Sequence, residues 1–250
     1  MNEPRFRERL PVEDYDLDAT LDSGQAFRWQ RVAGGWNGVV GDRAVRLEHV
    51  GDAIEAGTWA EPGDWEWLRD YLQTEVNLGE VLSCLPDDAP LSEAVEVCRG
   101  LRLLRQDPWE CLASFILSST KQIVQIRQVI GLLCERLGER VPGWDPSGVA
   151  LFPPASRVAD AGLELLGACR MGFRARYLRE AARRVASGEL DLEGLRGAGV
   201  EEARAELMEL PGVGRKIADC VLLFAYGHAT VFPVDVWVER ALRELYFPQQ

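Results

Sequence analysis

The spacing of apolar and polar residues changes along the chain and divides it into two regions. Over residues 25–54 apolar and polar positions alternate, as they do in strands with two unlike faces. Glycine-containing turns at 34–35 and 41–42 interrupt this alternation, so we expect an antiparallel meander with one face towards solvent. From residue 62 onward the apolar positions recur every three or four residues, which is typical of helices.

The second region is predicted to be almost entirely helical. Two short helices are expected before Pro108, one through Trp65, Leu68 and Tyr71 and one over residues 91–97. Beyond Pro108 the expected helices cover residues 109–117, 123–137, 156–166, 174–187, 200–209, 215–226 and 236–246. A sheet followed by helices predicts an α+β protein, with a sheet-containing domain over residues 1–107 and a helical domain over 108–250.

The net charge of -12 at first argues against a nucleic-acid-binding protein. The excess of acidic residues lies within residues 1–110, however, where 23 acidic side chains face 11 basic ones, and the rest of the chain holds 17 of each. The second part is therefore free to carry a local basic face. Six arginines within fifteen residues predict such a face: Arg170, Arg174, Arg176, Arg179, Arg183 and Arg184.

Composition narrows the remaining classes of protein. No apolar run reaches the roughly 18 residues of a membrane helix, and the start of the chain has no apolar leader, so we expect a cytoplasmic protein with no membrane partner. The six cysteines and two histidines stand singly, without the spacing of a metal site. Only two lysines occur, Lys121 and Lys216, and their rarity directs attention to chemistry that arginine cannot perform.

A turn between two predicted helices is the first candidate site. Pro211 and Gly212 end one helix, and Gly214 precedes another that starts near Arg215. Glycines allow the tight turn, and the free backbone amides of the second helix suit a phosphate. The pattern favours a hairpin that holds nucleic-acid backbone without reading sequence.

Lys216 and Asp235 form the second candidate site. Lys216 lies in the first turn of the helix after the hairpin, where it could simply contact phosphate or solvent. Asp235 follows a Phe-Pro-Val run and could simply cap the helix that begins at residue 236. Together they place an amine and a carboxylate at two helix N-termini that can face one pocket.

This combination resembles the helix-hairpin-helix DNA glycosylase superfamily, and within it the bifunctional 8-oxoguanine DNA glycosylase/AP lyase family. Three further blocks match that family's signatures: residues 23–29 (SGQAFRW), residues 103–108 (LLRQDP) with the following Glu-Cys pair, and residues 172–177 (GFRARY). The resemblance runs over residues 16–247 and implies a TATA-binding-protein-like antiparallel sheet domain before an all-α helix-hairpin-helix body.

The resemblance implies roles for individual residues. Lys216 would attack the anomeric carbon as a neutral amine and form a Schiff base that permits strand cleavage, and Asp235 would stabilise positive charge on the sugar. The carbonyl of Gly24 would accept the extra ring N–H of 8-oxoguanine, and Cys220 would line one face of that base. Asp219 is expected to be structural. No cofactor or metal is implied.

The resemblance also implies how the duplex is held. Phe173 would fill the gap left by the flipped nucleotide, and Arg174 would reach the orphaned opposite base. The alternative for Phe173 is ordinary packing at a helix start. The implied DNA-contacting residues are Thr120, Gln122, Phe173, Arg174, Gly212, Gly214 and Trp237. The expected partner is double-stranded DNA containing 8-oxoguanine or an abasic site, bound by a monomer on the bacterial nucleoid, or in the nucleus of a eukaryote.

Several positions depart from the family pattern. Thr120 and Gln122 stand where the family carries asparagines, and Gln125 stands where animal members carry an arginine that contacts the opposite cytosine. Weaker discrimination for cytosine is therefore expected. Trp237 replaces a phosphate-contacting histidine and brings no positive charge. Residues 246–250 end the sequence before the family's pocket-closing helix, so we expect reduced 8-oxoguanine excision with abasic-site lyase activity better preserved.

Three alternatives remain open at this point. An endonuclease III-like glycosylase for oxidised pyrimidines uses the same lysine and aspartate but lacks the SGQ-FRW block. An alkylbase glycosylase keeps the aspartate without the lysine. A non-catalytic hairpin module would use the turn only to hold phosphates, which leaves the pairing of Lys216 with Asp235 unexplained.

Overall fold

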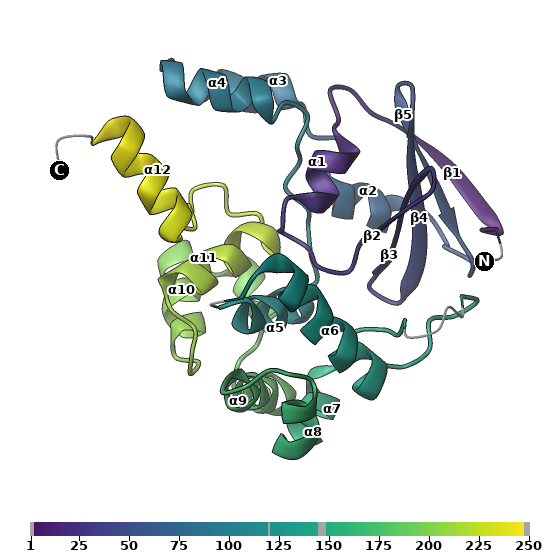
Figure 1. The fold of residues 1–250 in the computed structure, drawn as a ribbon, viewed down its shortest axis with the longest axis vertical. Coiled ribbons are helices and arrows are strands. Elements are labelled where there is room, and N and C mark those ends of the chain that lie inside the picture. Colours follow the sequence, from purple (N-terminus) through teal and green to yellow (C-terminus); the bar gives the residue numbers. More distant parts are fainter. Residues whose placement is uncertain (1–2, 120, 145–148, 248–250) are drawn as a thin grey trace.

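The computed structural model describes residues 3–119, 121–144 and 149–247, and it confirms the α+β class (Figure 1). Five antiparallel strands form one sheet in the order β1-β5-β4-β3-β2. The strands are β1 (Phe6–Pro11), β2 (Gln30–Val32), β3 (Gly35–Val40), β4 (Arg43–Val50) and β5 (Ala53–Thr58). Strands β3 and β4 lie where the meander was predicted, β5 continues it beyond the predicted strands, and β1 closes its edge beside β5.

Four helices accompany the sheet and nine helical segments follow it. The first four are α1 (Leu17–Asp22), α2 (Glu66–Leu72), α3 (Leu78–Ser83) and α4 (Ala89–Val97). The others are α5 (Pro108–Ser118), α6 (Ile123–Leu137), α7 (Ala155–Asp160), α8 (Leu163–Ala168), α9 (Arg174–Ser187), the 3-10 turn η1 (Gly194–Gly197), α10 (Val200–Met208), α11 (Arg215–Phe224) and α12 (Val236–Tyr246).

Two of the sequence-based expectations for these elements are wrong. Residues 26–29 are not a strand: Phe27 packs into the helical core, whereas Ala26 and Trp29 pack under the sheet, so the alternation reflects two cores. The expected helix over residues 156–166 is two helices, because the backbone at Ala161 and Gly162 is extended.

The sheet also has less exposed surface than a meander with one solvent-facing side. One face covers a core that includes Leu10, Trp36 and Leu47. On the other face Val39 and Ala44 belong to a second apolar cluster, which is completed by the stacked rings of Trp59 and Trp144. Apolar burial on both sides therefore stabilises the sheet.

The segment between the sheet and the helical body is fixed by hydrogen bonds to both. The backbone N–H of Arg105 donates to Tyr71 O at the end of α2, at 2.9 Å, and that of Gln106 donates to Phe224 O at the end of α11, at 2.8 Å. The side chain of Gln106 donates to the carbonyl of Gln25 at 2.7 Å. Three bonds within two residues thus connect α2, the loop after α1 and α11.

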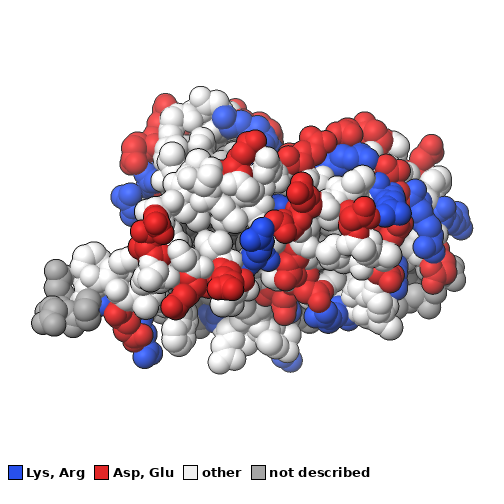
Figure 2. Space-filling model, turned by 90° about the horizontal axis from the view of Figure 1, so that it is seen from above, with Lys and Arg blue, Asp and Glu red and all other residues white. Residues whose placement is uncertain are grey.

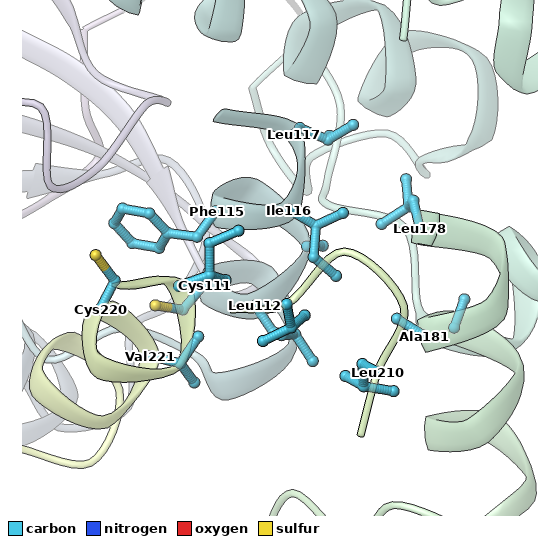
Figure 3. Close-up of a cluster of buried hydrophobic side chains, with 14 of the residues drawn as sticks. Cys111, Leu112, Phe115, Ile116, Leu117, Leu178, Ala181, Leu210, Cys220 and Val221 are labelled. Carbon is cyan, nitrogen blue, oxygen red and sulfur yellow. The ribbon is translucent and has the colours of Figure 1, made fainter. Parts of the chain in front are cut away.

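The helical body packs around α5. Figure 3 shows side chains of α5 between α11, which presents Cys220 and Val221, and α9, which presents Leu178 and Ala181. Helix α5 is buried along most of its length, as its apolar sequence predicts. It therefore provides the rigid support against which the hairpin and α11 are placed.

Charged side chains of both signs lie on the molecular surface. Figure 2 shows acidic and basic side chains interspersed over the upper face of the molecule. Helix α12 projects from the body (Figure 1), and Tyr246 Oη near its end donates to Asp88 Oδ1, at 2.8 Å. Within the described ranges, no helix has both the length and the apolar composition needed to cross a bilayer.

Candidate active site and DNA interface

The predicted hairpin is present between α10 and α11. Gly212 has a φ of +83°, and a Cβ at this position would overlap the ring of Tyr177, so only glycine fits. Gly214 is the N-cap of α11 and offers no side chain to bond the amides of its first turn. These exposed amides, at the positive end of a ten-residue helix, can bind an anion.

Lys216 lies in the first turn of α11 and is half-buried. Its Nζ lies 5.2 Å from the ring centroid of Phe115 on α5. Among the described residues, no carboxylate lies within the 4.0 Å of a salt bridge to this amine. The lysine is therefore held at an aromatic surface without an ion pair.

Asp235 caps α12, as its position after a Phe-Pro-Val run allows. Its Oδ1 accepts from the amides of Trp237 and Val238, each at 2.9 Å. Capping uses one carboxylate oxygen, and the N-terminus of α12 favours the negative charge. The structural reading of Asp235 is thus confirmed, and it leaves a second oxygen for chemistry.

Cys220 connects the two candidate catalytic residues. It follows Lys216 by one turn of α11 and is buried. Desolvation raises the pKa of the Cys220 thiol to about 11; the positive charge of Lys216 counteracts that rise and the negative charge of Asp235 adds to it. Both charges therefore lie within electrostatic reach of one buried thiol.

Gly24 lies in a tight, well-supported loop after α1. Its φ is +84°, and a Cβ would come within 2.9 Å of Ile123 Cδ1 at the start of α6. The next residue, Gln25, is buried, and its Nε2 donates to Arg102 O at 2.8 Å while its Oε1 accepts from Leu104 N at 2.7 Å. Sequence reasoning assigned no role to Gln25, although it lies within the SGQ-FRW block.

Phe173 is exposed and Arg174 is not. The Phe173 side chain is 58% exposed at the N-terminus of α9, which disagrees with ordinary core packing. Arg174 is buried beneath it, with its guanidinium 4.4 Å from the Phe173 ring centroid. Its Nε donates to Ser119 Oγ at 3.0 Å, and its Nη2 donates to Ser119 O. The expected side chain that reaches an opposite base is instead bound to the end of α5.

Two protein families match this chain, one over each half. Residues 9–112 match the family model of the 8-oxoguanine DNA glycosylase N-terminal domain, and residues 113–250 match that of the HhH-GPD superfamily of base excision DNA repair proteins. The chain is 30% identical to a probable N-glycosylase/DNA lyase of Methanothermobacter thermautotrophicus over 95% of its own length and 85% of that protein. The chain belongs to the 8-oxoguanine DNA glycosylase/lyase family.

Solved structures of this family have the same fold. The apo form of the Clostridium acetobutylicum 8-oxoguanine glycosylase/lyase superposes with a TM-score of 0.89 and is 31% identical in sequence. The match includes 98% of this chain and 86% of the Clostridium chain. MBOgg1 in complex with a low-affinity DNA ligand has a TM-score of 0.92 and 34% identity, with 100% of this chain and 86% of that one covered. The predicted family is confirmed; the match of the N-terminal domain decides against the endonuclease III-like alternative, and the similarity to an N-glycosylase/DNA lyase decides against the non-catalytic module.

The basic face expected on the glycosylase's α9 is partly neutralised. Arg183 and Arg184 form ion pairs with Glu180 and Glu189, and Arg179 donates to a backbone carbonyl. Arg174 is buried, as described above. Of the six arginines, Arg170, Arg176 and Arg179 are exposed and have no carboxylate partner among the described residues, because the carbonyl that Arg179 binds carries no net charge, so the basic surface is reduced to these three.

The structure shows the positions of Trp237, Gln122 and Asp219, but their predicted contacts with DNA stay predictions for the first two. Trp237 is exposed on α12, and Gln122 is exposed at the start of α6, where its N–H donates to Gln125 Oε1 at 3.1 Å. Thr120 lies outside the described residues. Asp219 is buried and accepts from Arg204 Nε at 2.6 Å, which agrees with its expected structural role.

The fit of Gly212 against Tyr177 predicts a measurable cost of adding one methyl group. Gly212→Ala should lower the free energy of unfolding by about 1–3 kcal/mol more than Gly188→Ala. Both glycines have positive φ, at +83° and +75°, so both variants carry similar backbone strain, but Gly188 has open space where a Cβ would lie. Denaturant unfolding measures the difference, and equal losses would contradict the Tyr177 contact.

The raised pKa of Cys220 predicts slow alkylation at neutral pH. Iodoacetamide reacts with thiolates, and a thiol with a pKa of about 11 stays protonated at about pH 8. We expect the exposed Cys84 and Cys98 to be labelled first, and Cys220 only as the pH approaches about 11. Peptide mass spectrometry follows each site, and labelling of Cys220 at the rate of Cys84 at about pH 8 would exclude the protonated, buried thiol.

Proposed function

We propose that this protein excises 8-oxoguanine from double-stranded DNA and then cleaves the strand, with Lys216 as the nucleophile. The observation that carries the proposal is the Lys216 amine, half-buried at the start of α11 and with no carboxylate of the described residues within 4.0 Å. The Clostridium acetobutylicum relative, 29% identical with a TM-score of 0.87, has been solved with double-stranded DNA containing cytosine opposite 8-oxoG. That duplex is the class of substrate we assign to this chain.

The first chemical step is nucleophilic displacement at the sugar. The lone pair of the neutral Lys216 Nζ forms a bond to C1′, and the bond between C1′ and the base nitrogen breaks. The electron pair leaves with the base, which takes up a proton. An arginine could not replace Lys216, because guanidinium stays protonated and has no available lone pair.

The second step is strand cleavage through a Schiff base. The bond between C1′ and the ring oxygen O4′ opens, and the sugar carbon becomes a protonated imine on Lys216. Loss of a proton from C2′ then breaks the bond between C3′ and its oxygen, so that the 3′ phosphate leaves. Water finally hydrolyses the imine and returns the lysine. No cofactor takes part in this sequence.

Asp235 stabilises the positive charge that develops on the sugar as the base departs. Its carboxylate is oriented by two hydrogen bonds that backbone N–H groups donate to Oδ1, so it needs no rearrangement as the positive charge forms on the sugar. Its negative charge raises the pKa of the Cys220 thiol and the positive charge of Lys216 lowers it, which supports a shared site for the three groups.

The flipped base and the duplex are held by separate groups. Gly24 accepts from the base through its backbone carbonyl, and the neutral thiol of Cys220 lines one face of the pocket. The exposed ring of Phe173 enters the DNA duplex and fills the gap that the flipped nucleotide leaves. The amides after Gly214 bind phosphate. With Arg174 bonded to Ser119 and Gln125 bonded to Gln122 N, discrimination for the opposite base is weak in this conformation.

The nucleophile is tested by trapping the Schiff base with borohydride. Wild-type protein mixed with an 8-oxoguanine:cytosine duplex should give a covalent DNA adduct, and Lys216→Gln should give none. Lys121→Gln is the matched control, because it removes the only other lysine and should leave the adduct unchanged. An adduct that persists in Lys216→Gln, or its absence from intact wild-type protein, would refute the assignment.

The double role of Asp235 allows its chemistry to be separated from its capping. Asn caps helices about as well as Asp, so Asp235→Asn should change the free energy of unfolding by less than about 1 kcal/mol. Loss of the negative charge should lower the single-turnover rate of base excision by about 10²-fold or more. If rate and stability fall together, Asp235 acts only as a helix cap.

A further inference from the structure

Phe115 is a buried aromatic side chain beside the proposed nucleophile. It lies on α5 and is 4% exposed. Its ring stacks on Phe224 of α11, with centroids 5.6 Å apart and an interplanar angle of 11°. It meets Phe27, from the loop before β2, edge to face at 5.8 Å and 72°. Three segments far apart in sequence therefore fix one ring.

The same ring faces the amine of Lys216. The distance of 5.2 Å between Nζ and the ring centroid lies within the roughly 6 Å over which aromatic faces attract cations. Lysine has a flexible four-carbon side chain, so an attacking amine needs some contact that fixes its position. Within the described part of the chain no carboxylate provides that contact, and the groups beside the amine are the Phe115 ring and the Cys220 thiol, a weak hydrogen-bonding group.

We propose that Phe115 is a positioning residue for Lys216. The aromatic face of Phe115 holds the lysine amine at the reacting sugar. The inference rests on the proposed role of Lys216 as the nucleophile. An aromatic face suits this purpose better than a carboxylate. An ion pair would strongly stabilise the charged ammonium, which cannot attack, whereas a ring holds the side chain through a weaker attraction.

The partners of Phe115 extend this role to the pocket. Phe27 follows Gly24 by three residues, in the loop that Gln25 bonds to the interdomain segment. Phe224 lies on the same helix as Lys216. Phe115 thus connects the loop assigned to base recognition with the helix assigned to catalysis, and it fixes the distance between them.

The test compares two identical substitutions within one core. Phe115→Leu keeps apolar volume but removes the aromatic face, whereas Phe152→Leu alters the same hydrophobic cluster at a ring that pairs with Trp109. Borohydride trapping on a saturating, preformed abasic-site duplex measures Schiff-base formation without base excision, and fluorescence anisotropy gives the Kd. We expect Phe115→Leu to slow trapping about tenfold at unchanged Kd, and Phe152→Leu to leave both values near wild type.

Two more variants keep the test decisive. Phe115→Tyr retains an aromatic face and should restore most of the trapping rate, whereas Phe115→Met fills the site without one and should behave like Phe115→Leu. The two also replace Phe115→Leu in the comparison if that variant does not fold. Equal rates in Phe115→Met and Phe115→Tyr, equal losses in Phe115→Leu and Phe152→Leu, or a loss confined to Kd would overturn the positioning role. Failure of wild-type protein to form any adduct would instead overturn the proposed function itself.

Discussion

The relative placement of the two halves depends on the buried amide of Gln25. A buried amide is costly unless its hydrogen bonds are made, and this one donates to the carbonyls of Thr20 and Arg102 and accepts from Leu104. The adjoining carbonyl accepts from Gln106, whose own N–H reaches the end of α11. Gly24 and α11, which carries the proposed nucleophile, are thus tied together through a few short bonds, and these bonds fix the distance between the two proposed parts of the site.

Two aspartates of the helical body, Asp219 and Asp235, differ in role because they differ in partners. Asp219 is buried on α11 and neutralised by Arg204, so its charge contributes to packing and is not available to a substrate. Asp235 is satisfied by backbone amides, which carry no net charge, so its negative charge remains available to the site. Residue type alone does not separate the two cases; the partner does.

The sequence predicted what local patterns determine. The helices over 123–137, 174–187 and 236–246, the glycine hairpin and the cap at Asp235 all depend on residues within a few positions of one another. It could not predict contacts between distant segments. Phe115 approaches Lys216 across 100 residues of chain, and Arg174 binds Ser119 instead of extending outward. Residues 26–29 have the sequence pattern of a strand because successive side chains of this segment pack into two different cores.

The acidic composition and the assigned DNA substrate are compatible because the groups that hold phosphate are not counted as charges. Arg183 and Arg184 of α9 are paired with glutamates, so the number of arginines overstates the positive charge that α9 presents to solvent. The amides at the start of α11 contribute partial positive charge that no sum of side chains includes. The acidic excess therefore describes residues 1–110 far better than it describes the hairpin and the start of α11, which we propose bind the duplex.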